Sequence, residues 1–218
     1  MHFCITGGSK GLGEALSKYV LLMNHELTII DKVRPSVKCR YIYHDFVRKL
    51  HVPIVCDVLV INHATFNGFT EFLREKKESV DEYLHINLLS HIQLIMHCKY
   101  SRLVYINSVL SIAPFPHASL YCASKGFMHN FLESLRRENM NILSVYPYKI
   151  DTEMFKEVWS PFALKRDVIC RDIYKSIISN DTHLYLPGIF KYAYLYTMLP
   201  SFAQDWLVAI FYYIMVRR

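Results

Sequence analysis

The N-terminal stretch constrains the fold of this chain more than any other segment. Residues 2–5 are mostly apolar, as in a buried parallel strand. A turn with four of the chain's seven glycines follows, with the sequence Thr6-Gly7-Gly8-Ser9-Lys10-Gly11-Leu12-Gly13. Residues 14–22 then show helical spacing of apolar side chains. Glycines let a backbone approach a ligand, and a helix start offers free amides, so this turn predicts a dinucleotide pyrophosphate site rather than an ordinary turn.

The rest of the chain alternates strand and helix patterns. We expect strands over residues 2–6, 26–30, 40–43, 57–62, 102–107, 141–146 and 183–186. We expect helices over residues 12–23, 77–98, 120–138 and 167–179. This alternation predicts an α/β fold, a single Rossmann-type, doubly wound parallel sheet with helices on both faces. Between Asp45 and Asp57 there is room for only a turn or two of helix, although a crossover usually takes a dozen residues or more. One face of the sheet should therefore be thinly covered there.

Several residues of functional type stand where the expected strands end. In a doubly wound sheet the ligand lies at the carboxyl ends of the strands. The residues at these ends are Thr6, Asp31, Asn62, Ser108 and Pro147. Their convergence predicts one shared site.

Tyr121 and Lys125 lie one turn apart on the same face of an expected helix. A phenol has an ordinary pKa of about 10 and is a poor acid–base group at neutral pH. A nearby ammonium group favours the phenolate and should lower that pKa. The pair could then pass a proton to or from a substrate oxygen. An isolated Tyr-x-x-x-Lys is usually a solvated helix face, but here it accompanies the glycine turn.

Together the turn and the Tyr/Lys pair resemble the short-chain dehydrogenase/reductase family in its non-extended form. The family's Thr-Gly-x-x-x-Gly-x-Gly pattern is matched by Thr6, Gly7, Gly11 and Gly13. Its catalytic Ser and Asn fall on Ser108 and Asn87. The resemblance covers residues 1 to about 155, and two motifs depart from it. The Asn-Asn-Ala-Gly segment reads Asn62-His63-Ala64-Thr65, and the Pro-Gly-x-x-x-Thr segment runs from Pro147 to Thr152 without its glycine.

The resemblance implies a role for each site residue. Tyr121 would exchange a proton with the substrate oxygen, and Ser108 would donate a hydrogen bond to it. Lys125 would lower the Tyr121 pKa and hold the nicotinamide ribose, and Asn87 would position a water molecule linking Lys125 to solvent. Thr152 would hold the carboxamide. Taken singly, Ser108 could be a turn residue, Asn87 a helix residue and Thr152 a helix cap. The expected cofactor contacts are Thr6, Gly7, Ser9, Lys10, Gly11, Leu12, Gly13, Asp31, Asp45, Asn62, Lys125, Pro147, Ile150 and Thr152.

The sequence leaves the choice between NAD and NADP open. Asp31 follows the glycines by about 20 residues, where a carboxylate accepts from the ribose 2′-hydroxyl and repels a 2′-phosphate. Lys10 and Lys32 could instead pair with a 2′-phosphate. Asp31 has the more direct position, which favours NAD slightly.

Composition narrows the partners. At 218 residues the chain is long enough for one full domain. Its net charge of +6 is scattered, so nucleic acid is not an expected partner, although an anionic membrane surface would attract it. None of the six cysteines forms a C-x-x-C pair or has zinc spacing with a histidine, so we predict reduced thiols and no metal site. No secretory signal fits before the first strand, so the catalytic part should face the cytosol.

The C-terminal tail is the second unusual feature. Residues 190–199 are rich in aromatic side chains, Pro200 follows, and residues 206–216 are apolar before Arg217-Arg218. Spanning a bilayer takes about 20 apolar residues, so this run is too short. We expect residues 1–188 to form the dinucleotide-binding and catalytic domain. Residues 189–218 would form a helical anchor at the cytosolic face of an internal membrane such as the endoplasmic reticulum. The alternative is a core helix or a homodimer helix.

The tail is also the only guide to the substrate. An apolar, membrane-attached reductase suggests a lipid-type ketone, and the chain looks most similar to lipid reductases such as 3-ketosphinganine reductase. Acyl-dihydroxyacetone-phosphate reductase and hydroxysteroid dehydrogenase are the competing interpretations. A non-catalytic nucleotide-binding scaffold is an alternative of another class, because fold does not fix function. All four catalytic positions are filled, which favours an enzyme.

Overall fold

The computed structural model describes residues 1–49, 53–155, 160 and 163–216. Within them a seven-stranded parallel sheet runs in the order β3-β2-β1-β4-β5-β6-β7. The strands are β1 (His2–Thr6), β2 (Glu26–Asp31), β3 (Arg40–Tyr43), β4 (Val58–Ile61), β5 (Arg102–Ile106), β6 (Ile142–Pro147) and β7 (His183–Leu186). The order reverses at β1 and β4, and this is the point where doubly wound sheets bind ligands. The predicted fold class is confirmed.

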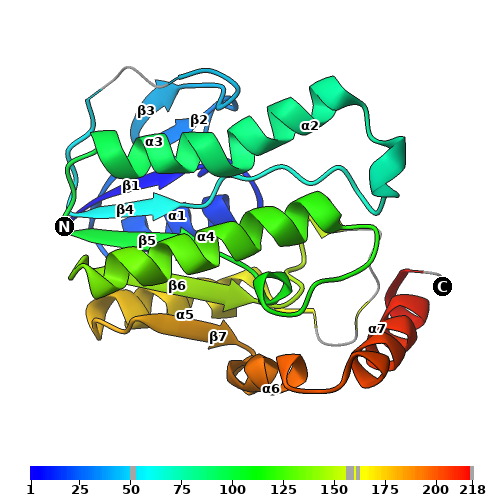
Figure 1. Cartoon of the computed structure of the whole chain (residues 1–218). Helices are drawn as coiled ribbons and strands as arrows, with labels where there is room; N and C mark the ends of the chain where they lie inside the picture. The colour runs from blue at the N-terminus through cyan, green and yellow to red at the C-terminus, as the bar shows by residue number, and fades with distance from the viewer. Residues whose placement is uncertain (50–52, 156–159, 161–162, 217–218) are drawn as a thin grey trace.

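Helices cover both faces of the sheet (Figure 1). They are α1 (Gly11–Leu22), α2 (Lys77–Leu84), α3 (Ser90–His97), α4 (Ser119–Arg137), α5 (Arg166–Ile178), α6 (Ala193–Thr197) and α7 (Ser201–Val216). Successive side chains of a strand point to opposite faces. Phe3 and Ile5 therefore pack into the core beneath α1 and α5, whereas Cys4 packs into the core beneath α3 and α4. Both faces are buried, which explains the almost continuous apolar strands.

The helix predicted over residues 77–98 is interrupted. It consists of α2, a π-helical segment over His85–Leu89, and α3. A π-helical turn holds an extra residue and often occurs at functional sites. Asn87 lies in this segment and is 1% exposed.

The connection from β3 to β4 is as thin as the sequence predicted. Its described residues, 44–49 and 53–57, contain no helix. Phe46 and Ile54, which are 7% and 5% exposed, pack into the core beneath α3. Two single side chains therefore cover this part of the sheet where other crossovers use a helix.

The C-terminal tail is helical. Beyond β7, a 3₁₀ helix over Gly188–Tyr192 leads into α6, and α7 follows Pro200. Figure 1 shows α6 and α7 at the end of the molecule toward which the strands point. The ring of Tyr212 lies 5.7 Å from that of Phe115 and 5.2 Å from that of His117, so α7 packs against the loop after β5. Across the described residues, no helix has both the length and the apolar character needed to cross a membrane.

Candidate active site

A cleft of about 700 Å³ lies at the carboxyl ends of the central strands. The predicted site residues that line it are Gly7, Lys10, Gly11, Leu12, Asp31, Asp45, Asn62, Ser108, Tyr121, Lys125, Pro147, Ile150 and Thr152. The other four predicted residues, Thr6, Ser9, Gly13 and Asn87, are not part of this lining. As described below, they hold the lining in place from behind.

The glycine turn is shaped to let a ligand approach its backbone. Gly7 and Gly11 have φ values of +63° and +58°, which favour glycine. A Cβ atom on Gly13 would lie 2.0 Å from the Gly7 carbonyl oxygen, so any side chain there would push the turn apart. No side chain caps the start of α1 at Lys10. The first amides of α1 therefore remain available to an anion.

Thr6 and Asn62 fix this turn from beneath. The Thr6 hydroxyl oxygen accepts a hydrogen bond from the Asn62 backbone amide at 3.1 Å. The Asn62 side-chain amide donates to the carbonyl oxygens of Thr6 and Gly7, at 3.2 and 2.9 Å. Thr6 is fully buried, so it supports the turn and has no exposed surface for a ligand.

Asp31 joins the glycine turn to the end of β2. One carboxylate oxygen accepts from the Ser9 backbone amide at 3.0 Å, and the other accepts from the Val33 amide at 3.1 Å. The Ser9 hydroxyl donates to the Val33 carbonyl oxygen at 2.6 Å. Lys32 lines the cleft beside Asp31, with its Nζ atom 3.9 Å from a carboxylate oxygen of Asp45.

His63 is a site residue that sequence reasoning did not identify. Its ring stacks on Phe46 with centroids 3.5 Å apart. Its Nδ1 atom lies 2.7 Å from the Thr6 hydroxyl, and its Nε2 atom lies 2.8 Å from the Ser90 hydroxyl. Burial, with the nearby charges of His91 and Lys125, holds the pKa of His63 well below its ordinary value. A neutral histidine thus links the glycine turn to α3, and the only signal in the sequence was the departure from the Asn-Asn-Ala-Gly motif.

Ser108, Tyr121 and Lys125 come together at one edge of the cleft. Ser108 follows β5, and its hydroxyl accepts from the Leu110 amide at 3.2 Å and is hydrogen-bonded to Tyr121. Lys125, one turn further along α4, donates to the Ile106 carbonyl oxygen at 2.7 Å. Its Nζ atom lies 5.7 Å from the centroid of the Tyr121 ring. The helix spacing predicted from the sequence is confirmed.

The predicted effect of Lys125 on Tyr121 is wrong in this structure. Burial raises the pKa of the Tyr121 phenol, and the hydrogen bond with Ser108 opposes that rise only in part. Burial also lowers the pKa of Lys125 to about 7. Desolvation disfavours the charged form of each group and outweighs their mutual attraction. Tyr121 therefore keeps its proton at neutral pH, whereas Lys125 can gain or lose one.

Asn87 holds the loop that follows β4. Its side-chain oxygen accepts from the Thr65 amide at 2.8 Å, and its side-chain nitrogen donates to the Thr65 carbonyl oxygen at 2.9 Å. Thr65 lines the cleft, so Asn87 sets the position of part of the wall. The water-positioning role that the resemblance implies stays a prediction.

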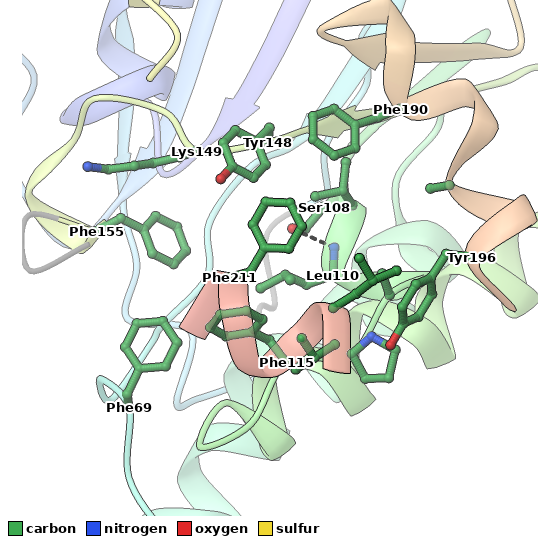
Figure 2. Close-up of a pocket in the computed structure, with 16 residues that line it drawn as sticks. Phe69, Ser108, Leu110, Phe115, Tyr148, Lys149, Phe155, Phe190, Tyr196 and Phe211 are labelled. Carbon is green, nitrogen blue, oxygen red and sulfur yellow. Dashed lines mark hydrogen bonds between the residues drawn. The ribbon is translucent and has the colours of Figure 1, made fainter. Parts of the chain in front are cut away.

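A second, apolar pocket of about 270 Å³ opens next to Ser108. Figure 2 shows aromatic rings from distant segments around it, with Phe211 projecting from α7 into its middle. The C-terminal tail contributes Phe190, Ala193, Tyr196, Leu207, Val208 and Phe211 to its lining. Sequence reasoning treated the tail as an anchor and missed this pocket, because nothing in the sequence places residues 190–211 beside Ser108.

Comparisons with known proteins agree with this arrangement. A model of the family described as short chain dehydrogenase matches residues 55–161. "Uncharacterized oxidoreductase TDA5" of Saccharomyces cerevisiae is 28% identical over 190 residues, covering 69% of this chain and 56% of that protein. "Hydroxysteroid 11-beta-dehydrogenase 1-like protein A" of Xenopus laevis is 26% identical over 192 residues, covering 81% of this chain and 62% of that protein. The chain thus spans little more than half the length of these two relatives.

Solved structures share the fold. A short chain dehydrogenase from Burkholderia cenocepacia in complex with NADP superimposes with a TM-score of 0.78 at 15% identity, covering 95% of this chain and 96% of that one. A 3-ketoacyl-(acyl-carrier-protein) reductase from Brucella melitensis complexed with NADH gives a TM-score of 0.70 at 16% identity, covering 84% and 95%. At this identity the likeness concerns the fold alone.

Proposed function

Because this chain belongs to the short-chain dehydrogenase/reductase family, we propose that it is an oxidoreductase that interconverts a carbonyl group and an alcohol with a nicotinamide dinucleotide. One observation carries the proposal. Ser108, Tyr121 and Lys125 lie together at the edge of a cleft whose other end is a glycine turn at a helix start. A proton donor beside a dinucleotide cleft is the arrangement that carbonyl reduction needs.

The chain's own residues suit a nicotinamide dinucleotide. The clearest fit is Gly13, where a Cβ atom would collide with the Gly7 carbonyl oxygen and close the approach to the uncapped α1 amides. Gly7, Lys10, Gly11 and Leu12 would hold the pyrophosphate. Ile150 and Thr152 would hold the nicotinamide end, and Asp31 and Asp45 the adenosine end. When bound, the nicotinamide supplies the hydride chemistry.

The protein groups then handle the proton. Tyr121, whose raised pKa keeps it protonated, would donate its proton to the substrate oxygen during reduction. Ser108 would donate a hydrogen bond to the same oxygen and stabilise its developing charge. Lys125 has a pKa near 7 and lies against the Tyr121 ring, so it is suited to exchange a proton with the surroundings of Tyr121 at neutral pH. Asn87 would keep the neighbouring wall in place.

The cofactor is NAD or NADP, and Asp31 favours NAD slightly. Its two carboxylate oxygens already accept from Ser9 and Val33, but each oxygen has a second lone pair for a ribose hydroxyl. Lys10 and Lys32 line the same end of the cleft and would favour NADP. These opposing groups leave both cofactors within the proposal.

For the substrate we propose a lipid-type ketone, similar to 3-ketosphinganine. The apolar pocket beside Ser108 supports this, since its lining is almost wholly aromatic and aliphatic. An acyl-dihydroxyacetone phosphate or a hydroxysteroid is the alternative. The printed name of the Xenopus relative favours the hydroxysteroid class.

We further propose that residues 189–218 both wall the pocket of the 1–188 domain and contact a membrane surface. The outward side of α7 carries Phe202, Trp206 and Tyr213, which are 77%, 65% and 68% exposed. Aromatic rings of this kind favour the headgroup level of a bilayer. Asp205 is the only charged residue on α7 in the described part of the chain, and the basic pair Arg217-Arg218 follows in the sequence. The cytosolic face of an internal membrane is the proposed location, and a homodimer is the alternative partner for this surface.

An assay of turnover and binding separates the enzyme from a scaffold. The purified protein is titrated with NADH and NADPH by fluorescence and then given a panel of apolar ketones. We expect ketone-dependent oxidation of at least one dinucleotide. A protein that binds dinucleotide but oxidises it with no member of the panel would be a nucleotide-binding scaffold.

A further inference from the structure

Tyr148 lies at the junction of the two cavities, and we propose that its ring limits the size of the smaller substituent on the substrate carbonyl. The inference rests on the proposed function and deepens it by specifying the substrate's shape. Within the described chain, the residues that line both the dinucleotide cleft and the apolar pocket are Ser108, Tyr148 and Phe155. A carbonyl group held by Ser108 would therefore lie beside Tyr148.

The Tyr148 ring is held in a fixed position. Its backbone amide donates to the Leu186 carbonyl oxygen at 2.8 Å, which continues the pairing of β6 with β7. The ring stacks on Phe190 with centroids 4.9 Å apart and an interplanar angle of 14°. Ser160 donates to its hydroxyl at 3.5 Å. Figure 2 shows the two stacked rings next to Ser108, with the Tyr148 hydroxyl directed toward the pocket.

Position 148 is also where this chain departs from the pattern it otherwise follows. The motif that begins at Pro147 has glycine as its second residue, and here that residue is tyrosine. Glycine would leave the junction open, whereas the phenol ring occupies it. Phe155 narrows the junction further, because its ring lies 5.8 Å from the ring of Tyr121 in an edge-on contact.

A carbonyl carbon carries two substituents, and the two cavities offer them unequal room. The apolar pocket of about 270 Å³ can take one long or bulky substituent. The second substituent must lie at the junction, between Tyr148, Phe155 and the dinucleotide cleft. The preferred substrates therefore have one large apolar group and one small group on the carbonyl carbon. Ketones with bulky groups on both sides are excluded.

Two isomeric ketones test this shape rule directly. 2-Undecanone has a methyl group on its small side, whereas 6-undecanone has a pentyl group on each side. We compare the wild-type protein with Tyr148→Gly, which opens the junction, and with Tyr148→Phe, which keeps the ring as the matched control. Each protein is saturated with dinucleotide. The kcat/KM of each ketone is measured by dinucleotide oxidation, and its Kd by saturation-transfer NMR, which needs no turnover.

The wild-type protein should prefer 2-undecanone by about tenfold or more, since single methylene groups in tight pockets change specificity by such factors. Tyr148→Gly should reduce that preference by about tenfold at an unchanged dinucleotide Kd, and Tyr148→Phe should retain it. Should the glycine variant not fold, Tyr148→Leu should give an intermediate preference. The inference is overturned if the smaller side chain leaves both ratios at their wild-type values, or if Tyr148→Phe shifts them equally. If the wild-type protein turns over neither ketone, the Kd ratios still decide the inference, and only the proposed function fails.

Discussion

The Nζ atom of Lys125 lies 5.7 Å from the centre of the Tyr121 ring and donates its hydrogen bond to the Ile106 carbonyl oxygen at 2.7 Å. Lys125 is 4% exposed, so its ammonium group sits in a medium that disfavours charge. The two residues that carry the proposed proton transfer are thus both shifted toward their neutral forms. This relationship gives the first prediction.

The stability of the protein should depend on pH through Lys125. Its pKa is about 7 in the folded state and about 10.4 when unfolded, so between these values the unfolded state binds more protons. The free energy of unfolding should therefore rise with pH from 7 toward 10, by up to about 1.4 kcal/mol per pH unit from this group. Urea unfolding at pH 7, 8 and 9 should show this slope in the wild type relative to Lys125→Met. Parallel pH profiles for the two proteins would contradict the shifted pKa.

Asp31→Ala should change the preference for the cofactor. Loss of the carboxylate removes an acceptor for the ribose 2′-hydroxyl and the repulsion of a 2′-phosphate. The Kd ratio of NADH to NADPH should move toward NADPH by about tenfold, which corresponds to about 1.4 kcal/mol. Both dinucleotides should also bind more weakly, because Asp31 holds the Ser9 amide of the glycine turn. An unchanged ratio in fluorescence titrations would assign the choice to Lys10 or Lys32.

Gly13→Ala should abolish dinucleotide binding. The added Cβ would lie 2.0 Å from the Gly7 carbonyl oxygen and 2.6 Å from the Asn62 side-chain nitrogen, so the turn must shift. Overpacking of this kind typically costs about 1–3 kcal/mol of stability. Gly188→Ala is the matched control, because nothing lies within 4 Å of its added Cβ. Equal dinucleotide affinities for the two variants, measured by fluorescence titration, would remove the tight turn from the proposed cofactor site.

The two sides of α7 should have separable roles. A triple variant, Phe202→Ser, Trp206→Ser and Tyr213→Ser, removes exposed aromatic rings and should lose most binding to phosphatidylserine vesicles in a flotation assay. Burying such a side chain is worth about 1.5–3 kcal/mol. The pocket-side pair Leu207→Ser and Val208→Ser should instead raise KM for a long-chain ketone and keep vesicle binding. If the triple variant floats like the wild type but changes mass in solution, the surface is a dimer interface.

Much of the fold and site could be predicted from the sequence because their signals are local. The glycine turn, the apolar strands and the i, i+4 spacing of Tyr121 and Lys125 each depend on residues close in the chain. The sheet order then follows from the alternation of strands and helices. The bounds of the predicted helices at 12–23, 120–138 and 167–179 each differ by one residue from α1, α4 and α5.

The remaining features depend on contacts between distant segments. The links from His63 to Thr6 and Ser90 join β4, β1 and α3, and no spacing in the sequence announces them. The π-helical segment that interrupts the long predicted helix leaves no compositional mark. The pKa of Tyr121 was predicted in the wrong direction because the sequence reveals a neighbouring charge but not the depth of burial.

Tyr121→Phe is the most direct test of the proposed enzyme. The substitution keeps the ring that packs against Phe66 and Phe155 and removes only the proton donor. Turnover of an apolar ketone is measured by dinucleotide oxidation, and dinucleotide Kd is measured by fluorescence on the same preparation. The account predicts that kcat falls by at least about 10²-fold, the lower end of what a positioned acid–base group contributes, while the dinucleotide Kd stays within about twofold of the wild type. A Tyr121→Phe protein that binds dinucleotide and reduces the ketone at close to the wild-type rate would contradict it.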